Sequence, residues 1–534
     1  MKRKLLAIVT SVLLVCAMLP LGAASVSAET YGDYRYTVSD GEVTITGCDL
    51  EVSGDLTIPA VIVGYPVTTI GRDAFWMCDS LTSVTIPDSV TTIEEYAFSA
   101  CDSLVSIYIP DSVTTIGHRA VAGGASLTNI SVDKNNPNYS SFDGVLFNKD
   151  YTVLITCPKG KSGSYAIHGN VTTVATEAFT DCDALTWITI PAATTTIEYQ
   201  AFSGCDALTK ISVHEENPNY SSENGVLFNK GKTVLIQYPN ANGAVYTIPD
   251  SVITIGKRAF SGCGSLTTVI IPDNVITIEE DAFATCYSLT TAIIGDGVVT
   301  IEDFAFAECV RLTTITIPDS VTSIGDDAFY YCLSLVAIFV DTNNSAYSSL
   351  DGVLFNKDKT HLILCPNAKS GVYTMPDSVT TIGDGAFTEC RSLTTVTIGD
   401  RVSVIGDGAF WNCSLTSVFI PGSVSVIGYG AFSTGTLTDV YYGGSEIRKQ
   451  QIAIDSHNDD LLNATWHYTV VYGDVSGDGA VNSRDLALLQ QYTADWDVII
   501  DEVAADVNAN GSVNARDVAL LQQYIAGWDV ELGK

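Results

Sequence analysis

A repeated unit of 23 residues occupies most of this 534-residue chain and limits its possible folds more than any other feature. The segment LTSVTIPDSVTTIEEYAFSACDS, residues 81–103, is followed directly by LVSIYIPDSVTTIGHRAVAGGAS. Neighbouring units are 23 residues apart, 58 where a segment is inserted, and 22 at the last step. A constant period of this length is typical of a solenoid of stacked coils. Each unit is anchored by one apolar residue after an alanine: Phe75, Phe98, Val121, Phe179, Phe202, Phe260, Phe283, Phe306, Phe329, Phe387, Phe410 and Phe432.

Apolar residues inside each unit follow two different spacings. Leu81, Val84 and Ile86 point to one face of a short β segment, which a proline then ends. Residues 90–93 form a second short apolar stretch, and residues 97–101 have helix-like spacing on the return arm. One unit cannot enclose these side chains, so neighbouring units must stack to bury them. The pattern predicts a repeat solenoid with short β segments and helical or irregular return arms.

Three insertions lengthen single coils by 35 residues each. Each contains an Asp-Gly or Asn-Gly turn followed by VLFN and a further apolar run. This order predicts a β-hairpin that stands off the solenoid. One tyrosine in each insertion (Tyr139, Tyr220 and Tyr347) either belongs to an exposed contact strip or packs the hairpin against its coil. The expected hairpins occupy about residues 133–166, 214–247 and 341–374.

The units resemble the BspA-like family of bacterial surface leucine-rich repeats, which has the consensus IP-x-SVT-x-IG-x-x-AF-x-x-C-x-x-L. The resemblance covers about residues 31–468 and includes an opening cap at about residues 31–70. We therefore expect a leucine-rich repeat solenoid over residues 29–470. The resemblance implies a secreted or surface-displayed binding scaffold whose repeats present a surface for a protein or a polysaccharide.

The N-terminal segment and the charge indicate where the protein acts. MKRK, the apolar residues 5–21 and the small residues Val26-Ser27-Ala28 predict a signal peptide over residues 1–28. No later stretch has the roughly 18 apolar residues of a membrane span, so we expect a secreted chain without a transmembrane segment. The net charge of -35 repels nucleic acid, suits a secreted protein that must stay soluble, and favours the binding of cations.

The cysteines follow the repeat. Thirteen remain after the signal peptide, and most of them recur at one fixed position of the repeat. This regular spacing favours free thiols in the core, with disulfides between stacked neighbours as the alternative. No histidine has metal-ligand or catalytic-triad spacing, which favours a chain that is not an enzyme. An enzyme with its carboxylates on the solenoid remains an alternative. Ten cysteines lie three residues after an anchor: Cys78, Cys101, Cys182, Cys205, Cys263, Cys286, Cys309, Cys332, Cys390 and Cys413.

An Asp-rich phrase occurs twice near the end of the chain, at residues 473–492 and 505–524. The two copies share 13 of 20 positions. Each places oxygen-bearing side chains at loop positions 1, 3, 5, 9 and 12, a glycine at position 6 and a backbone carbonyl at position 7, which is EF-hand-like spacing for calcium. The candidate ligands are Asp474, Ser476, Asp478, Ala480, Asn482, Asp485, Asp506, Asn508, Asn510, Ser512, Asn514 and Asp517.

Residues 473–534 resemble a type I dockerin, in which an F-hand loop is followed by a helix and no helix precedes it. The departure from the EF-hand is an aspartate rather than a glutamate at position 12. The resemblance implies two calcium ions, a small all-α fold that needs them, and a cohesin partner on a scaffoldin or cell-surface protein. The cohesin-binding positions would be Ser483, Arg484, Gln490, Gln491, Ala515, Arg516, Gln522 and Gln523. The Gln pairs could instead be ordinary exposed helix formers.

Together these features predict a non-catalytic, secreted scaffold that docks through calcium and a dockerin onto a cohesin of a cellulosome-like complex at the cell surface. Polysaccharide catabolism would then be the process it serves. The alternatives are a polysaccharide- or peptide-degrading enzyme with a site on the solenoid, and a plain surface adhesin.

Overall fold

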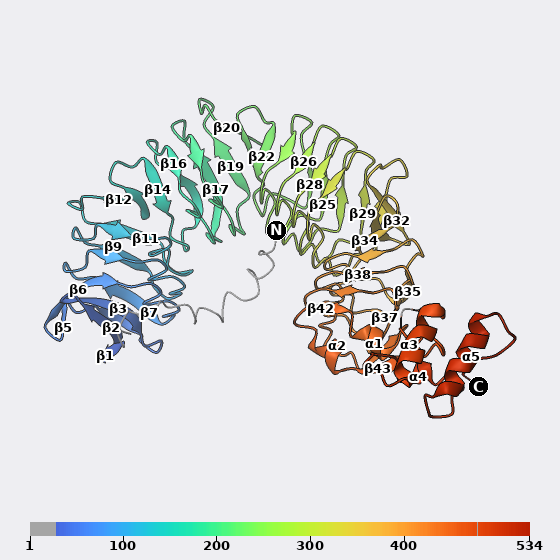
Figure 1. Ribbon diagram of the computed structural model, residues 1–534. Helices are drawn as coiled ribbons and strands as arrows, with labels where there is room; N and C mark the ends of the chain where they lie inside the picture. The colour runs from blue at the N-terminus through green and yellow to red at the C-terminus, as the bar shows by residue number, and fades with distance from the viewer. Residues whose placement is uncertain (1–27, 478, 534) are drawn as a thin grey trace. The chain divides into compact units, whose positions relative to one another are not determined.

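The computed structural model describes residues 28–477 and 479–533 (Figure 1). The described chain divides into two compact units. The first contains residues 28–162, 170–182 and 196–201, and the second contains the rest. The expected signal peptide lies outside the described residues except for Ala28. None of the helices in the described part is long and apolar enough to cross a membrane.

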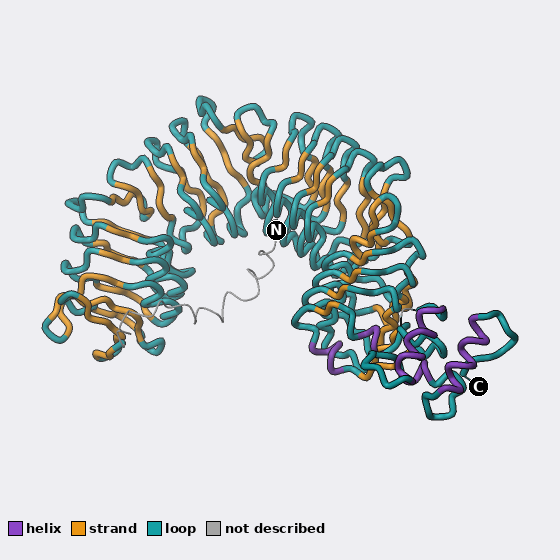
Figure 2. The backbone as a smooth tube through the Cα atoms, in the orientation of Figure 1, coloured by secondary structure: helices purple, strands orange, loops and turns teal. Residues whose placement is uncertain are grey.

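The first unit is built from three sheets, separated by loops and turns (Figure 2). Its first sheet contains β1 (Glu29–Tyr31), β2 (Tyr34–Ser39), β3 (Glu42–Cys48), β6 (Tyr65–Ile70), β8 (Thr92–Ile93) and β10 (Thr115–Ile116), with β5 (Val61–Ile62) paired to β6. The second contains β4 (Gly54–Thr57), β7 (Leu81–Thr85), β9 (Ser106–Ile109) and β11 (Asn129–Val132). The third contains β12 (Tyr139–Phe142), β13 (Val145–Asn148), β14 (Val153–Thr156), β16 (Thr173–Val174) and β18 (Thr196–Ile197).

The second unit continues the same construction. One series of sheets contains β15 (Gly163–Ala166), β17 (Leu185–Ile190) and β19 (Lys210–Val213); β23 (Val245–Thr247), β25 (Thr268–Ile270) and β27 (Thr291–Ile293); β29 (Thr314–Ile317) and β31 (Ala337–Val340); and β35 (Gly371–Thr374), β37 (Leu393–Thr397), β39 (Ser417–Ile420), β41 (Asp439–Tyr442) and β43 (Thr465–Tyr468). The other series contains β20 (Tyr220–Glu223), β21 (Val226–Asn229), β22 (Val234–Gln237), β24 (Thr254–Ile255), β26 (Thr277–Ile278), β28 (Thr300–Ile301) and β30 (Ser323–Ile324); and β32 (Tyr347–Leu350), β33 (Val353–Asn356), β34 (His361–Leu364), β36 (Thr381–Ile382), β38 (Val404–Ile405), β40 (Val426–Ile427) and β42 (Ala453–Ile454). The helices are α1 (Glu446–Lys449), α2 (Asp459–Asn463), α3 (Ser483–Thr493), α4 (Glu502–Ala505) and α5 (Ala515–Ile525).

The repeat period sets the strand register. Neighbouring coils pair in parallel, and Val84 lies opposite Ile107, one 23-residue period further along the chain. At the last step, where the sequence period is 22 residues, the offset between paired residues is 22 as well, and Val404 lies opposite Val426. Each coil thus hydrogen-bonds to the next at equivalent positions, and the predicted repeat solenoid is confirmed.

The return arms are irregular rather than helical. Backbone N–H groups that a helix would use internally donate to the next coil instead: Phe283 N to Ala305 O at 2.7 Å. In most coils the residues on either side of the alanine and its anchor adopt left-handed backbone conformations, for example Asp281 (φ 58°) and Thr285 (φ 59°). Because these conformations interrupt a right-handed helix, the helix-like apolar spacing produces consecutive turns.

The core is a ladder of stacked anchor rings. Phe306 is fully buried, and its ring centroid lies 4.9 Å from that of Phe283 and 5.7 Å from that of Phe329. The anchor cysteines line the same core. The thiol of Cys309 donates to the carbonyl oxygen of Phe283 at 3.3 Å, and that of Cys332 to Phe306 at 3.2 Å. The thiols therefore tie each coil to the one before it.

We expect these thiols to be unreactive in the native protein. None of the thirteen cysteines in the described residues forms a disulfide, and all thirteen are buried. Burial raises the pKa of the Cys101 and Cys332 thiols to about 12, so these two form almost no thiolate at neutral pH. A hydrogen bond with Cys48 lowers the pKa of Cys78 instead, and burial alone shields that thiol from reagent. Titration with a disulfide reagent at pH 8 should detect fewer than about one thiol per folded chain and all of them in denaturant. Rapid labelling of several thiols without denaturant would contradict this.

The insertions extend the solenoid instead of standing off it, which corrects the sequence-based expectation. In the first, β13 (VLFN) and β14 (the apolar run after it) form the predicted antiparallel pair, and β12 adds to the other edge of β13 across the Asp143-Gly144 turn. Strand β14 also joins the solenoid by pairing in parallel with β16. Val145, Leu146 and Phe147 are fully buried. The apolar VLFN segment requires this burial, and an isolated hairpin could not provide it.

A buried asparagine fixes each insertion to its coil. In the third, Asn344 donates from Nδ2 to the carbonyl oxygens of Pro318 and Val321 at 2.7 and 2.9 Å. Its Oδ1 accepts the backbone N–H of Tyr347 at 2.7 Å. Asn136 and Asn217 occupy the same position in the other two insertions. The NPNYSS-like segments therefore attach each insertion to the preceding coil by hydrogen bonds.

Asp327 in the second unit makes stability depend on pH. Burial, and then the carboxylates of Asp326, Asp303 and Asp384, raise the pKa of Asp327 to about 6. Because this exceeds the value of roughly 3.9 in an unfolded chain, the native state binds the proton more tightly. Protonated Asp327 therefore stabilises the native state below about pH 4, and this stabilisation is lost as the pH rises through 6.

Asp327→Asn should therefore stabilise the protein by about 1–2 kcal/mol at pH 7.5 and by little at pH 4. The left-handed backbone at this position (φ 54°) also suits asparagine. Thermal unfolding at the two pH values measures the effect, with Asp319→Asn, at an exposed turn, as the control. Equal effects at both pH values would contradict it.

Candidate functional site

The doubled phrase forms two matching loop–helix units. Asn482 caps α3 with backbone angles of -152° and -171°, and Asn514 caps α5 with -155° and -175°. In both, the cap side chain accepts a backbone N–H of the helix, and the position-12 aspartate accepts the cap N–H in return. This reciprocal capping box fixes the exit of each loop onto its helix.

The first loop folds around two buried carboxylates. Asp485 is fully buried, and its two oxygens accept the N–H groups of Ser476 at 2.8 Å and Asn482 at 2.9 Å. At the start of the loop, Asp474 accepts the N–H of Gly479 at 2.8 Å. Gly479 has a φ of 89°, a left-handed conformation that favours glycine at this sharp turn. Positions 1 and 12 are thereby held by the backbone of the loop that they enclose.

The second loop repeats this arrangement. Asp517 is fully buried and accepts the N–H groups of Asn508 at 3.3 Å and Asn514 at 3.0 Å. Asp506 accepts the N–H of Gly511 at 2.6 Å, and Gly511 has a φ of 85°. The remaining candidate ligands lie on the same two loops: Ala480, Asn510 and Ser512. Asp478 lies outside the described residues.

This donor set fits calcium. Within residues 28–477 and 479–533, no basic side chain forms an ion pair with Asp485, Asp506 or Asp517. Burying a carboxylate is costly unless a positive charge compensates it, and a hard cation bound in the loop would do so. No group of three His, Cys, Asp or Glu side chains gathers among the described residues. The loops instead offer carboxylate, amide, hydroxyl and carbonyl oxygens together.

The two loops share one hydrophobic core. Val475 and Leu489 of the first copy pack with their counterparts Val507 and Leu521 of the second. The four-residue helix α4 directly precedes the second loop, so the expectation that no helix precedes either loop is wrong there. Because the core joins both copies, disruption of one loop is transmitted to the other.

The second loop should bind calcium more weakly than the first. By sequence the first loop carries three carboxylates and the second two, because Asn510 occupies the position of Asp478. Calcium affinity rises with ligand charge. We expect Asn510→Asp to tighten the weaker site by roughly tenfold and Asp478→Asn to weaken the stronger one similarly. Calorimetric calcium titration measures both, and a tighter second site in the unaltered chain would contradict the ranking.

The eight candidate cohesin-binding residues lie on α3 and α5. Arg484 and Gln490 are exposed, as are their counterparts Arg516 and Gln522, while the second glutamine of each pair, Gln491 or Gln523, is half-buried. A separation of seven residues brings positions 483 and 490 to the same side of α3. Ser483 and Ala515 begin the two helices and are also exposed. Each helix therefore presents its candidate positions along one side.

Sequence reasoning missed two exposed tryptophans beside these positions. The backbone N–H of Trp496 donates to Gln491 O, and that of Trp528 to Gln523 O, both at 3.1 Å. Both indole side chains are 62% exposed. The signal was present, because a Trp-Asp-Val sequence follows each ALLQQY segment.

The insertion tyrosines pack against their coils, as the second of the two hypotheses states. The hydroxyl oxygen of Tyr139 accepts the N–H of Ile116, and that of Tyr347 the N–H of Ile324, both at 2.9 Å. Burial raises the pKa of Tyr139. Tyr220 is half-buried as well. These rings are not a free contact strip.

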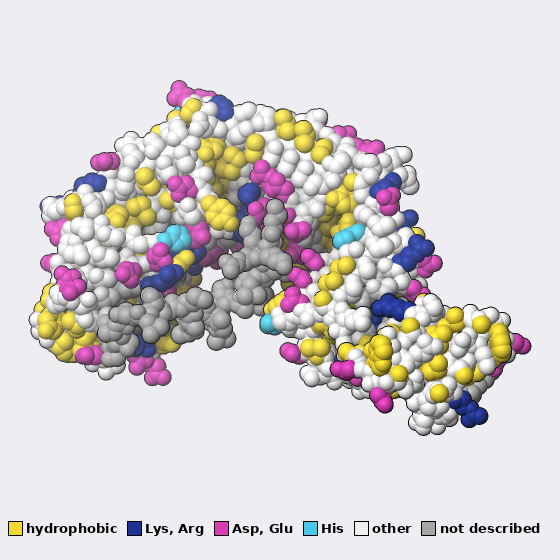
Figure 3. All heavy atoms as spheres, in the orientation of Figure 1, with side chains coloured by type: hydrophobic (Ala, Val, Ile, Leu, Met, Phe, Trp, Pro, Cys, Tyr) yellow, Lys and Arg dark blue, Asp and Glu magenta, His cyan; other side chains and the backbone are white. Residues whose placement is uncertain are grey.

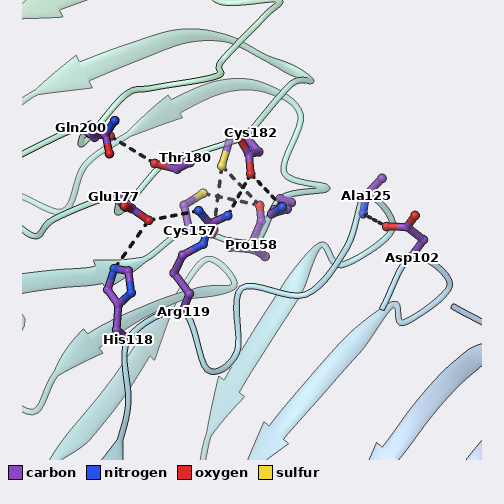
Figure 4. Close-up of polar contacts among 12 residues, drawn as sticks. Asp102, His118, Arg119, Ala125, Cys157, Pro158, Glu177, Thr180, Cys182 and Gln200 are labelled. Carbon is purple, nitrogen blue, oxygen red and sulfur yellow. Dashed lines mark hydrogen bonds and ion pairs between the residues drawn. The ribbon is translucent and has the colours of Figure 1, made fainter. Parts of the chain in front are cut away.

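A charged cluster in the first unit joins the coils on either side of the first insertion (Figure 4). The guanidinium of Arg119 lies 3.1 Å from Glu177 and 2.9 Å from Asp181, and Lys159 lies 2.9 Å from the same Asp181 oxygen. Burial opposes ionisation of Asp181, but hydrogen bonds from Lys159 and Arg119 lower its pKa. Every charge here has a partner, so the cluster braces a coil whose anchor is Val121 instead of phenylalanine.

Several solved structures are similar to this chain. A leucine-rich repeat protein from Eubacterium ventriosum ATCC 27560 is 24% identical, with a TM-score of 0.41, over 76% of this chain and 94% of that one. The pneumococcal vaccine antigen PcpA is 18% identical, with a TM-score of 0.38, over 84% and 99%. A leucine-rich cell surface protein from Faecalibacterium prausnitzii A2-165 is 25% identical, with a TM-score of 0.31, over 81% and 99%. No curated protein matches the chain.

Two family profiles match the chain. The BspA type leucine rich repeat region matches in six copies, over residues 56–160, 159–233, 237–356 and 365–451. The dockerin type I domain matches residues 472–526, which contain both loops and both capped helices. The first profile covers most of the coils, and the second covers the two loop–helix units.

Proposed function

The chain belongs to the BspA-type leucine-rich repeat family and ends in a type I dockerin domain, and on that premise we propose that it is a non-catalytic, secreted binding or adhesion scaffold. Its dockerin binds two calcium ions and docks onto a cohesin of a cellulosome-like complex. Its repeats present a surface to a protein or a polysaccharide. The extracellular location agrees with the expected signal peptide and with the net charge of -35.

The single observation that supports docking most strongly is the equivalence of the two loop–helix units. Each encloses a fully buried position-12 carboxylate and presents an exposed Arg and Gln along one side of its helix. Calcium would hold each loop and thereby set the direction of the helix behind it. Two equivalent helices also offer the same partner two surfaces, related by a half-turn. The two surfaces differ at one position, which is Ser483 in α3 and Ala515 in α5.

Calorimetric titration of the mature chain against a panel of cohesins, with and without calcium, tests this. We expect tight binding to at least one cohesin only with calcium. Arg484→Ala with Gln490→Ala, or Arg516→Ala with Gln522→Ala, should leave binding nearly intact because the other helix substitutes, whereas the combined variant should lose it. Asp529→Asn, at an exposed position after α5, is the control.

Absence of binding to any cohesin, with calcium bound and the helices folded, would contradict docking and return the chain to the plain-adhesin class. Hydrolysis of a plant polysaccharide or peptide by the purified chain would contradict the non-catalytic assignment. Saturable binding without turnover would agree with it.

A further inference from the structure

Three consecutive coils of the second unit, between the second and third insertions, carry an exposed apolar residue after one turn, and two of them also carry an apolar residue before it. We call this surface the acidic edge. It consists of Asp250, Asp273 and Asp296 at the turn, Ile270 and Ile293 before it, and Ile253, Ile276 and Val299 after it. Figure 3 shows hydrophobic side chains at the surface over the coils that carry β22 to β28.

The apolar residues of the acidic edge replace threonine or serine. Three residues after the turn aspartate, other coils have Thr114, Thr322, Thr380 or Ser403. Three residues before it, other coils have Thr85, Thr316, Thr374 or Thr397, and one has Tyr108. In the acidic edge Ile253, Ile276 and Val299 are 42%, 47% and 37% exposed, and Ile293 is 51% exposed. Several branched apolar side chains exposed side by side are unfavourable in water unless a partner covers them.

The carboxylates of the acidic edge have no cationic partner. All three are exposed, and within residues 28–477 and 479–533 none of them forms an ion pair. The nearest basic residues in sequence are engaged elsewhere, Lys257 with Glu280 at 2.8 Å and Arg258 with Asp281 at 3.1 Å. A negative potential therefore runs along this turn beside the apolar side chains.

The surface is also hollowed. A shallow groove of about 540 Å³ is lined by Ile270, Ile293 and the three aspartates, together with the turn residues between them. Successive carboxylates are one strand spacing apart, about 4.8 Å, which approximates the 5.4 Å rise of one helical turn. A helix with apolar residues on one side and lysine or arginine at every turn therefore matches both rows.

We infer that the acidic edge binds a cationic, amphipathic helical segment of a protein partner. This rests on the proposed role of the repeats as a binding surface and names the chemistry of what they bind. The apolar side of the helix covers Ile270, Ile293 and their neighbours, and its basic side chains pair with the three aspartates. A neutral glycan would need an exposed aromatic ring face, which none of these eight residues supplies. An acidic glycan would be repelled.

The test uses the mature full chain and a fluorescent amphipathic Leu/Lys peptide of about 14 residues, roughly four helical turns. At 50 mM NaCl we expect saturable binding that weakens at least tenfold at 500 mM, because salt screens exposed charges. A Leu/Glu peptide of the same spacing should not bind. A neutral β-glucan should neither bind nor compete.

Two combined variants separate the contributions. Asp250→Asn with Asp273→Asn and Asp296→Asn should weaken peptide binding about tenfold or more. Ile276→Thr with Ile293→Thr and Val299→Thr should weaken it about fivefold or more. Both leave the fold intact, because the second restores residues that other coils use and the first is nearly isosteric. The matched control is Asp319→Asn with Asp377→Asn and Asp400→Asn, which removes the same number of charges from turns flanked by threonine and serine, and it should change binding less than twofold.

Several results would overturn the inference. One is the absence of saturable peptide binding, and another is equal weakening in the control, which would assign binding to the overall negative charge. Competition by the β-glucan that the threonine variant abolishes would assign the edge to a glycan. Calcium-dependent cohesin binding is measured on every variant. If the chain binds cohesin but not the peptide, only the inference about the acidic edge is refuted. If it binds the peptide but no cohesin, only the proposal of docking is refuted.

Discussion

Chelation of calcium is expected to unfold the C-terminal dockerin while leaving the solenoid folded. At 1 mM free calcium, a site with a dissociation constant near 1 µM stabilises the folded form by about 4 kcal/mol. Two such sites together contribute about 8 kcal/mol, more than a core of this size supplies alone. Without the ions, the carboxylates of Asp485 and Asp517 remain buried without a compensating charge.

Hydrogen exchange with and without EDTA measures this directly. We expect α3 and α5 to lose protection in EDTA and cohesin binding to disappear, with exchange in residues 244–440 unchanged. At micromolar calcium, Asp485→Asn should likewise remove the protection of α3 and α5 and abolish cohesin binding. The substitution removes a candidate calcium ligand that also accepts two backbone N–H groups of the loop. The control is Asp495→Asn, at an exposed position after α3. Persistent protection of both helices in EDTA would show that calcium does not fold the domain.

Truncating one ring of the anchor ladder should have a comparably large effect on the solenoid. Phe306→Ala removes a fully buried ring that stacks on both neighbours. Loss of a buried phenylalanine costs about 3–5 kcal/mol, because the rigid coils collapse only partly into the cavity. Since each coil contacts only its neighbours, the loss should be concentrated in the coils around residues 283–329.

Denaturant titration combined with local hydrogen exchange measures the size and the spread of this effect. Phe306→Val should cost less, because one native coil is already anchored by Val121. Phe339→Ala is the matched control, since that ring is 51% exposed and its loss should change stability by less than about 0.5 kcal/mol. An effect of Phe306→Ala spread evenly over the whole second unit would contradict nearest-neighbour stacking.

The candidate site followed from the sequence because its geometry is local. Loop positions 1 and 12 lie within twelve residues of one another, so glycine at position 6 and asparagine at the helix cap define the loop without help from the rest of the chain. The places of Asp474 and Asp485 at the two ends of the loop were therefore predictable from spacing alone, and their role as calcium ligands stays a prediction. The repeated Trp-Asp-Val sequence marks Trp496 and Trp528, but only the structure shows that their side chains are exposed beside the candidate positions.

The sequence alone determined the solenoid and its register. A 23-residue period requires equivalent residues to pair, and Val84 does lie opposite Ile107. Only the tertiary structure decided how the insertions and return arms are built. The backbone partners of Phe283 and the solenoid partner of β14 are in the next coil. The same holds for surfaces, because Ile276 and Ile293 are unremarkable apolar residues until stacking exposes them beside a row of aspartates. Local spacing fixes which residues can pair, whereas burial and hydrogen bonding between coils decide which conformation and which surface result.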